Sequence, residues 1–326
     1  MDNLKTQQKL WKPDKPASKG ATAFHDAVVN ASWNNDNIIE LIKIIKEKIR
    51  ENDTVVDFGA GTGASALRLL EIIKFKINLW LVDNSLSWLT KAYELFSNNE
   101  NVKCFPLEKT GDKYSTLAET IGKDAANHVI SANVVHLIPN LDDAFEGLNA
   151  AIKPKGTFSF GSGNIARKGR EEGVLMIDDT VKMAHDIALE IVSTNDEFSD
   201  HRNGLNERIE IEEKQRQIVF PEPRPLELYL EAMKNAGFSC EAPQFRLIKV
   251  KYKDWMRLLR VKRLEAGILP EIGGKEPSPK EEQARDKLIT MSCNQLFKEL
   301  EEQNPFADDK SFTAEWVYVT STKKHY

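Results

Sequence analysis

A glycine-rich turn between a buried strand and a helix is the feature that most restricts the fold of this chain. Residues 54–63 read TVVDFGAGTG, and residues 64–74 continue as ASALRLLEIIK, which has a helical pattern. Glycine permits positive φ and leaves no Cβ beside an approaching ligand, so the turn suits a ligand site at the carboxyl end of a strand. We expect N–H groups in the turn and at the helix start to remain free for a polar ligand.

The alternation of strand and helix patterns continues to residue 164. Further strand patterns occur at residues 77–83, 101–108, 127–137 and 156–164, and helical patterns separate them. Strands separated in this way indicate right-handed βαβ units and a mostly parallel sheet. The sequence therefore predicts an α/β fold with a Rossmann-like, doubly wound sheet.

Composition along the chain divides it into four expected parts. Residues 1–35 look irregular, and residues 36–164 form the core that carries the glycine turn. Residues 165–224 are charge-rich and predict a helical insertion, either a solvated one or a lid. Residues 225–326 complete the core and contain a second helical insertion at about 253–312.

Charge and cysteine content exclude several classes of protein. The 326 residues contain 45 Lys and Arg and 50 Asp and Glu, a net charge of −5 that argues against nucleic acid as partner. Three widely spaced cysteines give no disulfide framework, and we expect no metal site. The first twenty residues are polar, and no apolar stretch is long enough for membrane insertion. We therefore expect a cytoplasmic protein; its oligomeric state stays open.

Two nucleoside ligands compete for the glycine turn. Gly59, Gly61 and Ala64 fit the dinucleotide pattern G-x-G-x-x-G/A. Asp57, however, lies two residues before the first glycine, where its charge would oppose a pyrophosphate and favour a ligand with a cationic amino acid end. S-adenosylmethionine has such an end and no phosphate. Asp83, at the end of the next strand, is placed to accept both hydroxyls of a ribose.

The ordered set of motifs resembles the class I S-adenosylmethionine-dependent methyltransferases. The resemblance rests on VVDFGAGTG, on Asp83, on ISANVVHLIPN and on LDDAFEGLNAAIKPKGTF. It covers residues 35–165, and more loosely 225–250 and 314–323. It implies a seven-stranded sheet in the order 3-2-1-4-5-7-6, in which AEWVYVTSTK would be the antiparallel last strand.

The resemblance also implies roles for individual residues. The loop around the methionine moiety would comprise Asp57, Gly59, Ala60, Gly61 and Gly63. The adenosine would be held by Asp83, Asn84, Ser85, Leu107 and Glu108, while Asn133 would line the methionine side. The cofactor is then S-adenosyl-L-methionine, with Trp11, Phe24 and Trp33 as an N-terminal cover.

The methyl acceptor and the catalytic base are less constrained. His136, in the exit of the fourth strand, is the candidate general base, or else a buried histidine that holds the loop before Pro139. His25 and His185 are further candidates. Two sets of side chains in the insertions either serve an acceptor or have plain structural roles. Met176, Met183, Phe198 and Trp255 either line an apolar pocket or pack as core. Arg257, Arg260, Lys262 and Arg263 either bind an acidic acceptor or form a solvated face.

We therefore expect an enzyme, a methyltransferase that acts on a small-molecule acceptor in a biosynthetic pathway. Three alternatives stay open: a non-catalytic scaffold with the same fold, a methyltransferase of macromolecules, and a nicotinamide-dependent enzyme. The same fold supports many chemistries, so the acceptor must be argued from the site.

Overall fold

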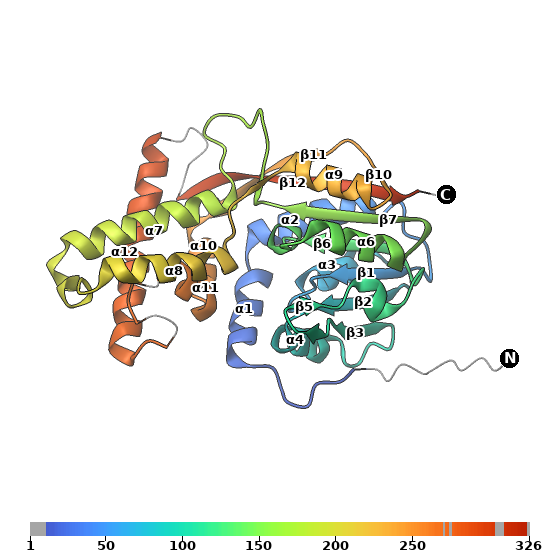
Figure 1. Cartoon of the computed structure of the whole chain (residues 1–326), viewed down its shortest axis with the longest axis horizontal. Helices are drawn as coiled ribbons and strands as arrows, with labels where there is room; N and C mark the ends of the chain where they lie inside the picture. Colours follow the sequence, from blue (N-terminus) through green and yellow to red (C-terminus); the bar gives the residue numbers. More distant parts are fainter. Residues whose placement is uncertain (1–10, 270, 274–275, 304–309, 325–326) are drawn as a thin grey trace.

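The computed structural model describes residues 11–269, 271–273, 276–303 and 310–324. At its centre is a twisted sheet with helices on both faces and a group of helices at one end (Figure 1). No described helix is both long and apolar enough to span a lipid bilayer.

The central sheet has the predicted strand order. Its strands are β1 (Thr54–Phe58), β2 (Asn78–Asp83), β3 (Val102–Pro106), β6 (Ala126–Ala132), β7 (Ile152–Ser162), β10 (Phe238–Cys240), β11 (Gln244–Lys251) and β12 (Ser311–Lys323). They are arranged β3-β2-β1-β6-β7-β12, and β10 and β11 both pair with the outer edge of β12. The order 3-2-1-4-5-7-6 and the antiparallel last strand are thus confirmed. One difference is that two short segments, β10 and β11, fill the sixth position.

Helices cover the sheet according to the alternation of its side chains. Successive residues of a strand point to opposite faces, so Val55 and Val56 of β1 belong to different core clusters. Val55 packs under α2 (Ser32–Ile45), α3 (Ala64–Ile72) and α4 (Leu86–Phe96). Val56 packs under α5 (Leu117–Ile121), α6 (Leu141–Ala151) and α9 (Leu226–Asn235). Short additions are the pairs β4 (Lys109–Thr110) with β5 (Lys113–Tyr114) and β8 (Ile165–Ala166) with β9 (Arg224–Pro225), and the 3-10 turns η1 (Val135–Leu137) and η2 (Asp196–His201).

The remaining helices gather beyond the carboxyl ends of the parallel strands, at the left of Figure 1. They are α7 (Ile177–Thr194), α8 (Leu205–Val219), α10 (Tyr252–Leu259), α11 (Lys262–Ile268) and α12 (Pro279–Gln303). α7 and α12, which come from the two expected insertions, pack against each other. Phe198 and Trp255, which are 1% and 2% exposed, belong to their shared core, and Met183 packs against it. These three residues therefore pack as core rather than line an open pocket.

The N-terminal segment differs from the expectation of irregular chain. Residues Lys19–Val29 form a helix, α1, which Ser18 caps by accepting a hydrogen bond from the Ala21 N–H at 3.1 Å. The expectation was wrong because small residues give this stretch a weak apolar pattern. Its buried residues Ala21, His25 and Val28 are nevertheless at the helical spacing i, i+4, i+7.

Candidate cofactor and acceptor site

The glycine turn is closed by its own hydrogen bonds. The N–H groups of Gly59 and Ala60 both donate to Val82 O, at 2.8 and 3.0 Å, and that of Gly63 donates to Ala60 O. The Gly61 N–H donates to Asp83 Oδ2 at 2.7 Å. The expectation that the turn keeps its N–H groups free was therefore wrong for these four, because Val82 O, Asp83 Oδ2 and Ala60 O accept their hydrogen bonds. At these four positions a pyrophosphate would find no free donor.

Gly59 is required by both its conformation and its surroundings. Its φ is +75°, and a Cβ at this position would lie 2.5 Å from the Val134 side chain. Gly61 and Gly63 also have positive φ, and Gly63 is the N-cap of α3. The turn thus brings the carboxyl end of β1 against the loop after β6.

Asp57 is the unusual residue of the turn. Its side chain is 1% exposed, and neither carboxylate oxygen has a hydrogen-bond partner of good geometry among the described residues. Burial, with a smaller contribution from the charge of Asp83, raises the pKa of Asp57 to about 7; the N–H of Ala66 offsets only part of this rise. An unpartnered buried carboxylate is costly in the ligand-free protein, and a cationic group beside it would remove that cost.

Asp83 keeps acceptor capacity for a ligand. Its Oδ1 accepts from the Ser85 N–H and its Oδ2 from the Gly61 N–H, both at 2.7 Å. A carboxylate has about four lone-pair sites, so roughly two remain for the hydroxyls of a ribose. Burial raises its pKa, while these N–H groups and the nearby Arg263 act in the opposite direction.

The expected adenosine residues lie around Asp83. The Leu107 N–H donates to Asp83 O at 2.9 Å, and Leu107 is partly buried. Ser85 is the N-cap of α4, and Asn84 is exposed beside it. Glu108 is exposed, and its N–H donates to Ser115 Oγ at 3.0 Å. β2, β3 and α4 thus bring all of the expected adenosine residues to one edge.

Helix α1 covers the glycine turn. His25 Nδ1 lies 3.2 Å from Thr62 Oγ1, and Phe24 stacks on Trp88 with ring centroids 4.2 Å apart. The guanidinium of Arg263, from α11, lies 5.0 Å from the centre of the same Trp88 ring. The turn is therefore flanked by both the N-terminal segment and the second insertion.

The other two tryptophans expected in the cover have different roles. Trp11 packs edge-on against Tyr93 of α4, with ring centroids 6.2 Å apart. Trp33 is 5% exposed and contacts Trp255 and Trp316, each with a centroid distance of 5.9 Å. Trp33 thus belongs to the core between the sheet and the insertions.

Asn133 and His136 lie in the loop that leaves β6. Asn133 has a φ of +57°, and its Oδ1 accepts from Trp316 Nε1 at 2.9 Å, which leaves its NH₂ for other contacts. His136 Nδ1 lies 3.0 Å from Ser162 Oγ. Burial and the charge of Arg224 lower the pKa of His136 to about 4, so the imidazole is neutral at pH 7.

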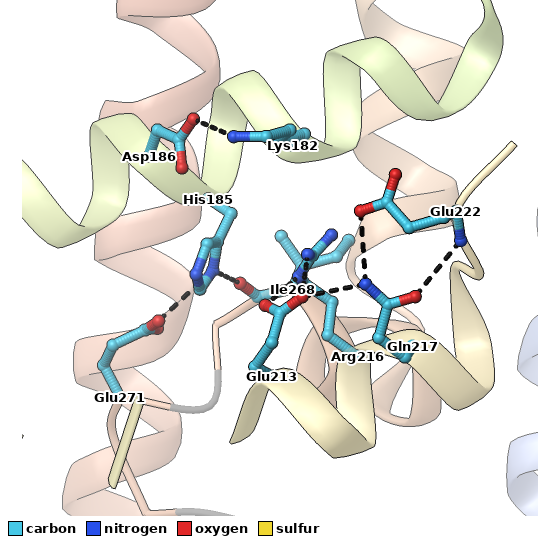
Figure 2. A network of polar contacts seen from close by, with 9 residues as sticks. All are labelled: Lys182, His185, Asp186, Glu213, Arg216, Gln217, Glu222, Ile268 and Glu271. Atoms are coloured by element: carbon cyan, nitrogen blue, oxygen red, sulfur yellow. Dashed lines mark hydrogen bonds and ion pairs between the residues drawn. The ribbon is translucent and has the colours of Figure 1, made fainter. Parts of the chain in front are cut away.

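Two of the four cations predicted in the second insertion are ion-paired. Arg260 Nε lies 2.7 Å from Asp286 Oδ1, and Lys262 pairs with Glu282. These two contacts agree with a solvated, ion-paired face, whereas Arg263 lies over Trp88 beside the glycine turn. The other distant candidate, His185, lies within the helical insertions, 2.7 Å from Ile268 O and 3.2 Å from Glu271 (Figure 2).

Comparison with known proteins identifies the fold. No protein-family model matches this sequence, and no curated protein matches it. Among solved structures, the YcgJ protein from Bacillus subtilis has a TM-score of 0.50 and 16% identity over 89% of this chain and 99% of its own. The [4+2]-cyclase SpnF has a TM-score of 0.50 and 12% identity over 94% of this chain and 98% of its own. The phosphoethanolamine N-methyltransferase 2 of Haemonchus contortus, in complex with S-adenosylhomocysteine, has a TM-score of 0.49 and 16% identity over 94% of this chain and 58% of its own.

This chain has the class I methyltransferase fold. That fold also includes a [4+2]-cyclase, so the fold by itself does not decide the reaction. The side chains at the carboxyl edge of the sheet must decide it.

S-adenosylmethionine fits the residues that the methyltransferase fold brings to this edge. Asp57 offers an unpartnered buried carboxylate, and Asp83 offers free lone pairs. The sequence indicated His25 as a candidate base and Phe24 as part of the cover, but it did not reveal the contact of His25 with Thr62 or the stacking of Phe24 on Trp88. Their contacts depend on the path of α1 across α4, which no local pattern reveals.

Proposed function

We propose that this chain is an S-adenosylmethionine-dependent methyltransferase that acts on a small molecule. One observation carries the proposal: four N–H groups of the glycine turn are bonded within the protein, while the buried Asp57 carboxylate has no hydrogen-bond partner in the described part of the chain. Such a site favours a cationic nucleoside without phosphate over a dinucleotide.

The chain's own residues have distinct parts in this proposal. Asp57 faces the ammonium end of the cofactor, and Asp83 accepts the ribose hydroxyls, while Leu107 packs against the base. Phe24 and Trp88 keep water away from the turn, since they are stacked over it from two different helices. When bound, the cofactor supplies an electrophilic methyl group on a sulfonium.

His136 is the proposed proton acceptor for a hydroxyl or similar acceptor group. Its imidazole is neutral at pH 7, so it has a free lone pair on one ring nitrogen. Its pKa of about 4 makes it a weak base, so most of the rate enhancement would come from the positioning of the two substrates.

A small acceptor and a cytoplasmic location are also proposed. The net charge of −5 and the ion pairs of Arg260 and Lys262 leave little basic surface for a nucleic acid. The three cysteines Cys104, Cys240 and Cys293 are all free, which supports a reducing compartment.

The deciding experiment is calorimetric titration with S-adenosylhomocysteine, with NADH as a parallel ligand. We expect saturable binding of S-adenosylhomocysteine alone. Binding of NADH alone would overturn the cofactor. A labelled methyl donor and a panel of small acceptors then test turnover, since a protein that binds the cofactor and transfers no methyl group to any acceptor would be a scaffold or catalyse another reaction.

A further inference from the structure

A buried polar cluster lies at the carboxyl end of β7, directly beside His136. Ser162, the last residue of β7, has its Oγ 3.0 Å from His136 Nδ1 and accepts from the Asn164 N–H at 3.2 Å. Asn164 is fully buried, and its Nδ2 donates to Pro221 O at 3.1 Å. Ligands of open α/β sheets bind at this end of the strands.

Asp178, in the first turn of α7, belongs to the same cluster. The N–H of the preceding residue, Ile177, donates to Gly163 O at 3.0 Å, which brings the start of α7 against the end of β7. The charged groups around Asp178 are Asp179, Arg216 and Glu222. Since Glu222 directly follows Pro221, Asn164 and Asp178 both lie close to the same short segment.

Two acceptor atoms of this cluster have no hydrogen donor. Within the described part of the chain, neither Asn164 Oδ1 nor Asp178 Oδ2 has a hydrogen-bond partner, and both atoms are buried. The orientation of the Asn164 amide is fixed by its bond to Pro221 O, so the atom left over is the acceptor. Buried polar atoms are rarely left unpaired, which points to a ligand that donates hydrogen bonds here.

The nearby arginines already have hydrogen-bond partners within the protein. Arg216 makes a paired contact with Glu213, Nε to Oε2 at 2.9 Å and Nη2 to Oε1 at 2.5 Å, as Figure 2 shows. Glu222 is held by Gln217, whose Nε2 lies 3.3 Å from its Oε1. Arg224 donates to three backbone carbonyls of the His136 loop, at 2.8 to 3.3 Å. Arg224 keeps its positive charge, since its partners are neutral carbonyls, but the two arginines face the four carboxyl groups of Glu213, Asp178, Asp179 and Glu222, so acidic groups outnumber basic ones here.

The protonation of Asp178 agrees with this charge balance. Burial, with the neighbouring Asp179 and Glu222, raises its pKa to about 8, while Arg216 acts in the opposite direction. The neutral His136 adds no positive charge. A cationic ligand would remove the cost of the buried carboxylate, and an anionic ligand would increase it.

We propose that Asn164 and Asp178 form the acceptor subsite and that it takes a small molecule with an amino group, whose N–H groups donate to Asn164 Oδ1 and Asp178 Oδ2. This inference rests on the proposed function, and it replaces the acidic acceptor that the basic residues of the second insertion suggested. The cationic residues Arg260 and Lys262 are ion-paired, whereas Asp178 Oδ2 has no hydrogen-bond partner among the described residues.

Saturation-transfer NMR with two isosteric series tests the charge preference of the subsite. The probes are ethanolamine, ethylene glycol and glycolate, and the larger benzylamine, benzyl alcohol and benzoate, each with and without S-adenosylhomocysteine. The protein is the full chain, compared with the variants Asp178→Asn and Glu222→Gln. The control is Asp186→Asn, on the same helix, where the exposed carboxylate pairs with Lys182.

We expect the amine of at least one series to bind better than its neutral and anionic counterparts. Asp178→Asn should weaken that amine about tenfold and Glu222→Gln two- to threefold, with no change for Asp186→Asn. Because Glu222 is exposed, that variant still tests the inference if Asp178→Asn fails to fold.

The inference is overturned if neither amine binds, if the neutral or anionic probes bind equally well, or if neither variant weakens the amine. Failure of the proposed function is distinguishable from this outcome. If S-adenosylhomocysteine does not bind while the amine preference persists, only the cofactor assignment falls. If S-adenosylhomocysteine binds without any amine preference, only the acceptor subsite falls.

Discussion

Replacement of Asp57 by Asn is expected to stabilise the ligand-free protein while it weakens cofactor binding. Asp57 is buried without a hydrogen-bond partner among the described residues, and its pKa is raised from 3.8 to about 7. The folded state thus favours the protonated form. The contribution of this group to stability is complete below pH 3.8 and is lost as the pH rises through 7.

The size of this loss follows from the shift. A rise of about 3 pKa units corresponds to a loss of about 4 kcal/mol once the pH is well above 7. Part of that loss has already occurred at pH 5, so about 2–3 kcal/mol remains between pH 5 and pH 8. Asn cannot ionise, so the variant should gain about this amount relative to wild type over the same interval.

Urea unfolding of both proteins at pH 5 and pH 8 measures this gain. The difference between two pH values cancels the packing cost of the amide, which is the same at both. Asp112→Asn, in the exposed turn between β4 and β5, is the matched control and should show no such gain. An Asp57→Asn effect of equal size at both pH values would refute the buried, unpartnered carboxylate.

The same variants test the role of Asp57 in ligand binding. Saturating S-adenosylhomocysteine should raise the free energy of unfolding more for wild type than for Asp57→Asn at pH 8, because its ammonium group pairs with the carboxylate. Equal stabilisation of the two proteins would remove Asp57 from the cofactor site.

Three further predictions concern the remaining site residues. Asp83→Ala should lower the affinity for S-adenosylhomocysteine about ten- to hundredfold, because hydrogen bonds to a charged group are worth about 1.5–3 kcal/mol; unchanged affinity in calorimetry would exclude Asp83 from the site. His136→Ala should lower kcat with little effect on cofactor affinity, and the wild-type pH profile should show no ionisation of this group above pH 5, because its pKa is lowered to about 4; normal turnover would leave His136 a structural role. Gly59→Ala should destabilise the fold, since its Cβ would lie 2.5 Å from Val134 at a φ of +75°; a melting temperature equal to wild type would contradict the close approach.

The sheet could be predicted because its signals are local. Each strand is a short apolar run, each helix follows within a few residues, and right-handed crossovers leave few possible orders. The split of the sixth strand into β10 and β11 could not be predicted, because it depends on pairing with β12 from the end of the chain.

The site could be predicted in part. Asp57 and Asp83 follow from their places at strand ends, but the internal bonds of the glycine turn depend on Val82 O, a group from another strand. Asn164 and Asp178 carry no motif and are fourteen residues apart in sequence. The bond between Ile177 N–H and Gly163 O, which no local pattern predicts, brings them to one place.

Buried carboxylate oxygens without a partner among the described residues occur in both halves of the site. Both oxygens of Asp57 and Oδ2 of Asp178 are of this kind, and each imposes a cost that a cationic ligand would remove. A protein that holds such groups sacrifices stability in the empty state, which is common at functional sites. Since the cost of each carboxylate is removed separately, the cofactor and an amine acceptor should each stabilise the chain, and Asp57→Asn should reduce the first effect while leaving the second unchanged.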